Sequence, residues 1–284
     1  MTTKPASAGL GSRMAFIVLG KSNPKGLDKA LLQQASYVFD LPWYAAKHEL
    51  APSKGITLLE AAIDHLLISA AKEEKGSATD TSMAEELPLK QAKAKRKALE
   101  LTPGPWFDPA WYRGKYCPSA LGSAGALNHF LRLGAAAGND PCPYFQTAHY
   151  MGRYPATHRR IADHKSRNAL EDYVLYGEAR RYSPNQWFDE VWYVETDPLL
   201  GKQWASGQLR SGFRHYLATG ADEGRDPGPT FSERRYCAVH PDVAFAISEG
   251  TMRCAFEHWI LFGRDEGRSL GHETISGRQL IGAW

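Results

Sequence analysis

The chain has 284 residues, of which 43% are hydrophobic and 11% aromatic, as in a globular protein with a substantial core. Its 34 basic and 31 acidic residues leave a formal net charge of +3, which argues against a dedicated nucleic-acid-binding protein. The apolar run at residues 14–19 is too short for a secretion signal or a membrane span, so we expect a cytoplasmic protein without a transmembrane segment. The 4 cysteines are scattered without a C-x-x-C pair, and we expect reduced thiols, no bound metal and no cofactor.

One short pattern occurs five times along the chain: a phenylalanine, usually followed by a polar capping residue, and a tyrosine five positions after the phenylalanine. If the residue after the phenylalanine is a helix N-cap, the two aromatic residues occupy the N′ and N4 positions of a hydrophobic staple. We call the five copies segments 1 to 5 and predict a helix start in each. The predicted ring contacts are Phe39 with Tyr44, Phe107 with Tyr112, Phe145 with Tyr150, Phe188 with Tyr193, and Phe231 with Tyr236.

The expected N-caps differ in quality. Good capping residues stand in four segments, at Asp40, Asp108, Asp189 and Ser232. Segment 3 has Gln146 instead, which is a poor cap, so we expect the most frayed helix start there.

A second helical pattern closes each of segments 2 to 5 and ends on a glycine. Apolar residues seven, four and three positions before the glycine form one stripe, as on a helix that buries one face. We expect the glycines to take the left-handed C′ position of a helix end. They are Gly134, Gly177, Gly220 and Gly263.

A histidine recurs five residues before the end of the closing helix. His65, His129, His215 and His258 hold this register, and Asp172 takes the place in segment 3. We expect these side chains to bond the last carbonyl groups of the helix, with a metal or carbohydrate site in each copy as the alternative. Between the two helices of a segment lies a variable stretch, best seen in segment 5. There His240–Ser248, with Asp242 as the expected cap, indicates a short middle helix, although its spacing also permits a strand.

The spacing of these patterns indicates a stack. Phe145, Phe188 and Phe231 are 43 residues apart, and 11 residues separate each closing glycine from the next phenylalanine. A flexible linker has no reason to keep one length, so the constant joint predicts neighbours that stack in one geometry. The expected fold is all-α, with tandem helical repeats of about 43 residues stacked as a short solenoid-like array. The expected parts are an N-terminal arm at 1–36, a degenerate first repeat at 37–76, a charged linker with a helix at 77–104, four repeats at 105–272 and a tail at 273–284.

The pattern as a whole resembles a family. Tandem units of the form F-D-x-x-Y-Y, P-D-V-A and H-Y-x-x-x-G-x-x-E-G-R-x-P occur in bacterial proteins beside glycosyltransferase and other polysaccharide-biosynthesis domains. Here "HPDVAFA", "GADEGRDP" from Gly220 and "GRDEGRSL" from Gly263 carry the resemblance, which covers residues 107–271 and, more weakly, 39–75. "GAAAGNDP" and "GEARRYSP" lack the E-G-R element. The resemblance implies a protein partner, such as a glycosyltransferase or another polysaccharide-assembly component.

Two sets of residues are candidates for ligand binding. Glu223, Arg225, Glu266 and Arg268 lie in the "DEGR" turns, where they form either an anion or sugar site on one rim of the stack or local ion pairs. Trp111 and Trp192 precede the staple tyrosines and either stack on sugar rings or belong to the core.

Two functions are therefore expected from the sequence. The first is a non-catalytic interaction module or scaffold that assists bacterial surface-polysaccharide assembly. The second is a glycan-binding or glycan-processing protein that uses exposed aromatic residues and the "DEGR" loops. No arrangement of catalytic residues rises above chance, so an enzyme is the minority interpretation. The role of the basic cluster Lys93–Lys97 is left open.

Overall fold

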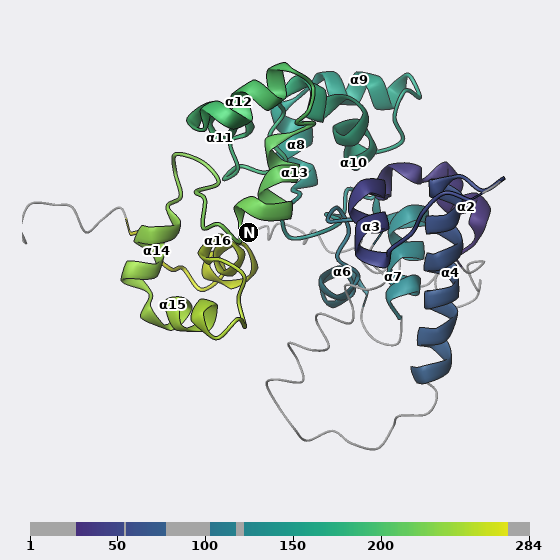
Figure 1. The fold of residues 1–284 in the computed structure, drawn as a ribbon, viewed down its shortest axis with the longest axis horizontal. Coiled ribbons are helices and arrows are strands. Elements are labelled where there is room, and N and C mark those ends of the chain that lie inside the picture. The colour runs from purple at the N-terminus through teal and green to yellow at the C-terminus, as the bar shows by residue number, and fades with distance from the viewer. Residues whose placement is uncertain (1–26, 54, 78–102, 118–121, 272–284) are drawn as a thin grey trace, which may run out of the picture.

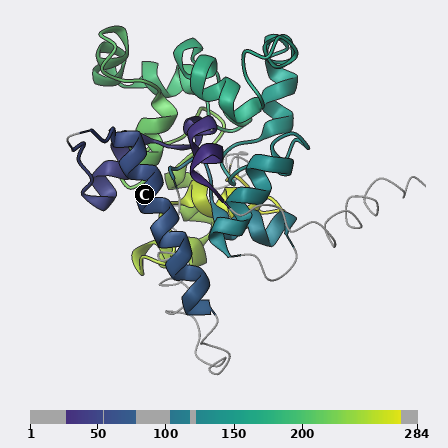
Figure 2. The ribbon, with the colours of Figure 1, turned by 90° about the vertical axis from the view of Figure 1, so that its right-hand side faces the viewer.

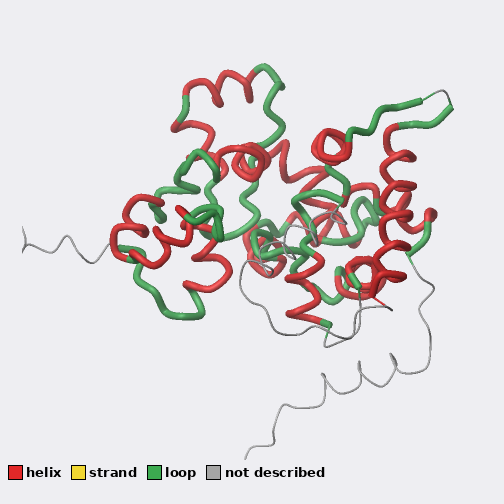
Figure 3. The backbone as a smooth tube through the Cα atoms, turned by 60° about the horizontal axis from the view of Figure 1, so that its bottom comes forward, coloured by secondary structure: helices red, strands yellow, loops and turns green. Residues whose placement is uncertain are grey.

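The computed structural model describes residues 27–53, 55–77, 103–117 and 122–271, and in these residues the fold is all-α (Figure 3). Within the described ranges, β pairing is limited to two isolated bridges, Ser53 with Ile56 and Gly228 with Phe231. Most of the expected linker, the basic cluster Lys93–Lys97 and the expected C-terminal tail lie outside the described residues.

The N-terminal elements lie at one side of the molecule (Figure 1). They are α2 (Lys29–Gln34), a short 3-10 turn (Ser36–Val38), α3 (Leu41–His48) and α4 (Leu58–Ser77). The far end of the long helix α4 extends away from the body of the molecule (Figure 2). Part of the expected N-terminal arm is therefore folded: α2 buries Leu32 completely.

Segments 2 to 5 share one order of elements. Each begins with a helix after its phenylalanine; these helices are α6 (Pro109–Tyr116), α8 (Thr147–Arg153), α11 (Glu190–Thr196) and α14 (Glu233–Val239). Each closes with a short helix; these helices are α7 (Ser123–His129), α10 (Ala169–Asp172), α13 (Gly212–His215) and α16 (Ala255–His258). A π-helical turn follows each closing helix, at Phe130–Gly134, Tyr173–Gly177, Tyr216–Gly220 and Trp259–Gly263.

The expected middle helix is confirmed in three segments. It is present as α9 (Ala156–Ala162), α12 (Pro198–Ala205) and α15 (Pro241–Ser248). Its N-cap in segment 5 is His240, so our expectation that Asp242 caps it was wrong. These middle helices lie toward the outside of the molecule, while α13 and α16 lie toward its centre (Figure 1).

The five predicted staples are all present as ring contacts. Centroid distances are 5.7 Å for Phe39 and Tyr44, 5.3 Å for Phe107 and Tyr112, 5.5 Å for Phe145 and Tyr150, and 5.2 Å for both Phe188 with Tyr193 and Phe231 with Tyr236. Asp40, Asp108 and Asp189 cap their helices through a side-chain oxygen. Gln146 does not, as expected, but neither does Ser232, which corrects its assignment as a good cap.

The closing glycines serve a purpose that differs from the expected one. None of the four has a positive φ; the left-handed position falls four residues later, at Gly138, Arg181, Gly224 and Gly267. The closing glycines are needed for close approach, because a Cβ atom on any of them would lie closer than 3.0 Å to the hydroxyl oxygen of the staple tyrosine in the same segment. Each tyrosine hydroxyl therefore sits directly against the π-helical turn of its own segment.

The joints between segments are hydrogen-bonded on both sides. The backbone N–H of each of four N-cap residues donates to a proline carbonyl in the joint that follows its segment. These bonds join Asp40 to Pro103 at 3.2 Å, Asp108 to Pro141 at 3.1 Å, Gln146 to Pro184 at 3.0 Å and Asp189 to Pro227 at 3.0 Å. In three joints, the residue directly before the proline caps the helix that opens the following segment. The side chains of Asp140, Ser183 and Asp226 accept from the first backbone N–H of that helix. A joint therefore positions both neighbours.

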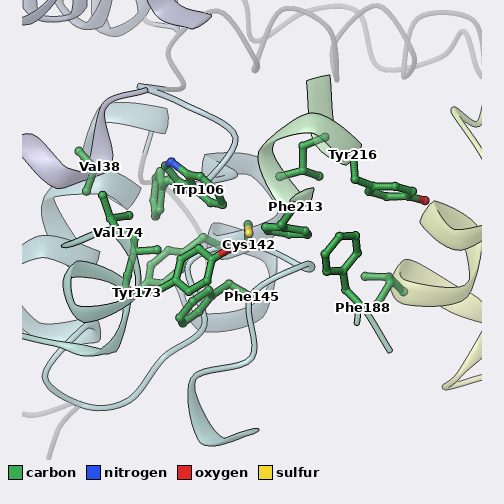
Figure 4. Packing of buried hydrophobic residues seen from close by; sticks show 14 of the residues in the cluster. Val38, Trp106, Cys142, Phe145, Tyr173, Val174, Phe188, Phe213 and Tyr216 are labelled. Atoms are coloured by element: carbon green, nitrogen blue, oxygen red, sulfur yellow. The ribbon is translucent and has the colours of Figure 1, made fainter. Parts of the chain in front are cut away.

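The core extends beyond nearest neighbours (Figure 4). The ring of Trp106, at the start of segment 2, lies 5.7 Å from Tyr173 in segment 3 and 5.6 Å from Phe213 in segment 4. Tyr144, at the start of segment 3, lies 6.2 Å from Phe256 in segment 5. Contacts that skip one segment were not expected, and they require a tight turn of the chain from segment to segment.

A partly buried ion-pair network also crosses the centre. Arg214 of segment 4 pairs with Asp40 of segment 1 and with Glu178 of segment 3, and its guanidinium lies 4.7 Å above the Trp106 ring. Arg210 completes the network with a contact of 2.6 Å to Glu178. Because buried charges are costly unless they are paired, this network favours one arrangement of segments 1, 3 and 4, with the Trp106 ring of segment 2 packed against it.

The tyrosine-against-glycine packing leads to a stability prediction. In Gly220→Ala, the new Cβ would collide with the hydroxyl of Tyr193, and we expect a loss of about 1–3 kcal/mol of unfolding free energy in urea denaturation. The control Gly152→Ala, where nothing lies within 4 Å, should be neutral or slightly stabilising. Adding Tyr193→Phe to Gly220→Ala should recover part of the loss. Wild-type stability for Gly220→Ala alone would contradict the packing.

Candidate functional site

The arginines of the "DEGR" turns form ion pairs inside their own segments. Arg225 contacts Glu223 at 2.5 Å and Asp197, the N-cap of α12, at 2.7 Å. In segment 5, Arg268 contacts Glu266 at 2.6 Å and Asp242 at 2.7 Å. Each arginine thus ties the turn to the start of the middle helix. Hydrogen bonds from Arg225 and Arg268 hold the pKa of Asp197 and of Asp242, respectively, below the usual range.

The tryptophans that precede the staple tyrosines are half-buried. Trp43, Trp111 and Trp192 all pack against the core with one side. The Nζ atom of Lys47 lies 4.8 Å from the centre of the Trp43 ring, and Lys115 lies 4.6 Å from that of Trp111.

Trp192 lines a groove between segments 4 and 5, which we call the Trp192 groove. Its volume is about 530 Å³. It is lined by Trp192, Tyr193, Thr196, Asp197, Pro198, Gly224, Arg225, Asp226, Ser232 and Arg234. Of the ligand-binding candidates, the structure brings Trp192 and Arg225 together here, with Glu223 bonded to Arg225. Trp111, Glu266 and Arg268 do not line this groove.

The recurring histidines bind the staple tyrosines. The distance from the tyrosine hydroxyl oxygen to histidine Nδ1 is 2.9 Å for Tyr44 with His65, Tyr112 with His129, and Tyr193 with His215, and 3.0 Å for Tyr236 with His258. This corrects the expectation that the imidazoles bond the helix carbonyls. Burial lowers the pKa of all four histidines, which favours the neutral ring.

Segment 3 replaces the histidine with a buried acid. The carboxylate of Asp172 accepts from the Tyr150 hydroxyl at 2.9 Å, from the Thr157 hydroxyl at 3.0 Å and from Arg160 Nη2 at 2.8 Å. Burial alone would raise its pKa, but the hydrogen bonds, first that of Arg160, hold the pKa of Asp172 below its usual value. The sequence showed the substitution of Asp172 in the register, but it gave no sign of its partners.

Two buried glutamates were missed by sequence reasoning. Glu190 accepts from the backbone N–H groups of Gly212 and Phe213, and Glu233 accepts from those of Ala255 at 2.7 Å and of the next residue at 2.9 Å. Each glutamate caps the closing helix of its own segment. Burial raises the pKa of both to about 7, against the opposing effect of the amide hydrogen bonds. A signal was present, because both stand two residues after the segment phenylalanine.

In the described part of the chain, no group of three or more His, Cys, Asp or Glu side chains could hold a metal ion. None of the helices there has both the length and the apolar character needed to cross a membrane. The four cysteines are free, and three of them are buried. Comparison of the chain with models of protein families, with curated proteins and with solved structures finds no match.

The raised pKa of Glu190 predicts a pH effect on stability. Because its folded-state pKa of about 7 exceeds the usual 4.5, its contribution is full below pH 4.5 and is lost as the pH rises through 7. Glu190→Gln should therefore lose about 1–3 kcal/mol less stability than wild type between pH 4.5 and 7.5, as measured by denaturation at each pH. The exposed Glu195→Gln is the control. Parallel pH profiles for Glu190→Gln and wild type would refute the assignment.

Proposed function

We propose that the chain is a non-catalytic interaction module, with five helical repeats stacked as a short solenoid-like array that presents a rigid docking platform to another protein. The observation that carries this proposal is that the recurring polar side chains form bonds within their own segments. The histidines, the "DEGR" arginines and the buried glutamates each bond a partner from another helix of the same segment. They hold elements together, as expected of a scaffold built from repeats.

The middle helices are the proposed docking surface. They carry the two most exposed large apolar side chains of the described residues, Phe245 on α15 at 67% and Leu199 on α12 at 61%. Both helices lie toward the outside of the molecule, where a partner can approach them (Figure 1). Exposed apolar side chains on equivalent elements of a repeat array commonly mark a binding face.

The proposed partner is a component of bacterial surface-polysaccharide assembly, such as a glycosyltransferase. This part of the proposal rests on the resemblance of the "HPDVAFA" and "DEGR" elements to repeats that accompany such enzymes. The chain would then act as an accessory protein that holds assembly components in place.

Substitution on α15 tests the docking surface. Phe245→Lys introduces the residue that α12 has in the equivalent position, Lys202, so we expect folding stability within about 0.5 kcal/mol of wild type. Affinity capture with the full chain, from the bacterium that encodes it, should recover a polysaccharide-assembly protein. Recovery should fall about tenfold with Phe245→Lys, as for an aromatic interface anchor. Undiminished recovery with a stable Phe245→Lys variant would rule out this surface.

A further inference from the structure

The Trp192 groove lies where segment 4 differs from segments 2 and 3 at two neighbouring positions, Thr196 and Asp197, the second of which is a histidine in segments 1 and 5. Nine residues after the segment phenylalanine stand Tyr116 in segment 2 and Tyr154 in segment 3, but Asp197 in segment 4. In the first two cases, the tyrosine hydroxyl fills the space beside the joint. The aspartate is shorter and turns toward Arg225 and the N-terminus of α12.

The missing tyrosine leaves a hydrogen-bond position vacant. The Tyr116 hydroxyl accepts from the backbone N–H of Asp140 at 3.1 Å, and the Tyr154 hydroxyl accepts from that of Ser183 at 2.8 Å. The equivalent joint residue of segment 4 is Asp226, six residues after its closing glycine. Among the described residues, no atom accepts from the Asp226 N–H. A hydroxyl group of a ligand in the groove would restore the bond that segments 2 and 3 make internally.

The aromatic wall of the groove is uncovered as well. The lysine that lies over the Trp111 ring stands four residues after it, and Trp192 has Thr196 at that place. In the described structure, no cation lies over the Trp192 ring. A half-buried indole with an open face suits the apolar face of a pyranose ring.

Two aspartates, Asp197 and Asp226, and two arginines line the groove, and Arg234 is the arginine that can attract an anionic group. Arg225 is neutralised by Glu223 and Asp197. Arg234 is exposed and forms no ion pair with any described residue, so its guanidinium can bind a carboxylate with two parallel hydrogen bonds. The Ser232 hydroxyl, which does not cap its helix, is available to donate or accept.

We propose that the Trp192 groove binds an acidic saccharide, in particular a hexuronic acid residue of a glycan. One ring hydroxyl accepts from the Asp226 N–H, the sugar ring stacks on Trp192, and the carboxylate pairs with Arg234. The volume of about 530 Å³ lies within the usual range for small-ligand sites. This site is separate from the surface around Phe245 and goes beyond the docking function, so either proposal can fail without the other.

Titration of the full chain with defined probes tests the site. The probes are trigalacturonate, the neutral maltotriose and a triglutamate peptide. The binding of each probe is measured by calorimetry. Trp192→His introduces the residue that segment 3 has at this position, His149, and should weaken trigalacturonate binding at least about tenfold. The matched control Trp111→His alters the same position of segment 2 and should leave binding unchanged. Arg234→Gln should reduce the preference for trigalacturonate over maltotriose.

Asp197→Tyr provides a second, independent variant. It restores the residue type that closes the space in segments 2 and 3, and we expect it to abolish saccharide binding while thermal unfolding shows a folded protein. The proposal is overturned if neither trisaccharide binds wild type, if triglutamate binds as tightly as trigalacturonate, or if Trp111→His weakens binding as much as Trp192→His.

Discussion

A single backbone hydrogen bond, repeated at each joint, sets the arrangement of the segments. The N–H of an N-cap residue donates to a proline carbonyl in the joint that follows the same segment, and this occurs at Pro103, Pro141, Pro184 and Pro227. Proline cannot continue a helix, and its carbonyl remains free to accept. The joint is therefore folded back along its own segment before it reaches the next one. The Pro103 bond shows that segment 1 is held by the same device, even though many residues separate it from segment 2.

This constraint explains why contacts reach past the nearest neighbour. Because the joints turn the chain back, the residues before the phenylalanines of segments 1 and 2, Val38 and Trp106, are completely buried, whereas Thr230 of segment 5 is exposed. Trp106 thereby meets Tyr173 in the π-helical turn of segment 3 and Phe213 in the closing helix of segment 4 (Figure 4). Arg214 uses the same centre to bind Asp40 of segment 1. The central contacts add cooperativity that a stack with contacts only between adjacent repeats lacks.

The sequence predicted the features that depend on residues close together in the chain. The five staples, the middle helices and the caps at Asp40, Asp108 and Asp189 follow from short spacings in one helix and its flanks, and all of these are present, whereas the expected cap at Asp242 is not. The purpose of the closing glycines was not predictable in this way. It depends on a tyrosine hydroxyl brought from the first helix of the segment, 20 or more residues earlier in the chain. The Tyr–His pairs and the network around Asp172 escaped prediction for the same reason.

The candidate site was predictable only in part. Trp192 and Arg225 stood out by residue type, but their convergence follows from the path of the joint. The groove itself results from two positions of segment 4, where Thr196 and Asp197 stand in place of the lysine and the tyrosine of segment 2. The effect of these two replacements could not be predicted from the sequence, because only the structure shows that the tyrosines of segments 2 and 3 bond the joint and that Lys115 covers the Trp111 ring.

The length of the joint is the most direct test of the account. Deleting the exposed Pro229 moves Phe231 one residue closer to the Pro227 carbonyl, whereas deleting the exposed Gln208 shortens a loop inside segment 4. We expect denaturation to show a loss of roughly 3 kcal/mol or more for the first deletion and about 1 kcal/mol for the second, because loops inside a unit tolerate length changes. Equal losses for the two deletions would contradict a joint that fixes the geometry of its neighbours.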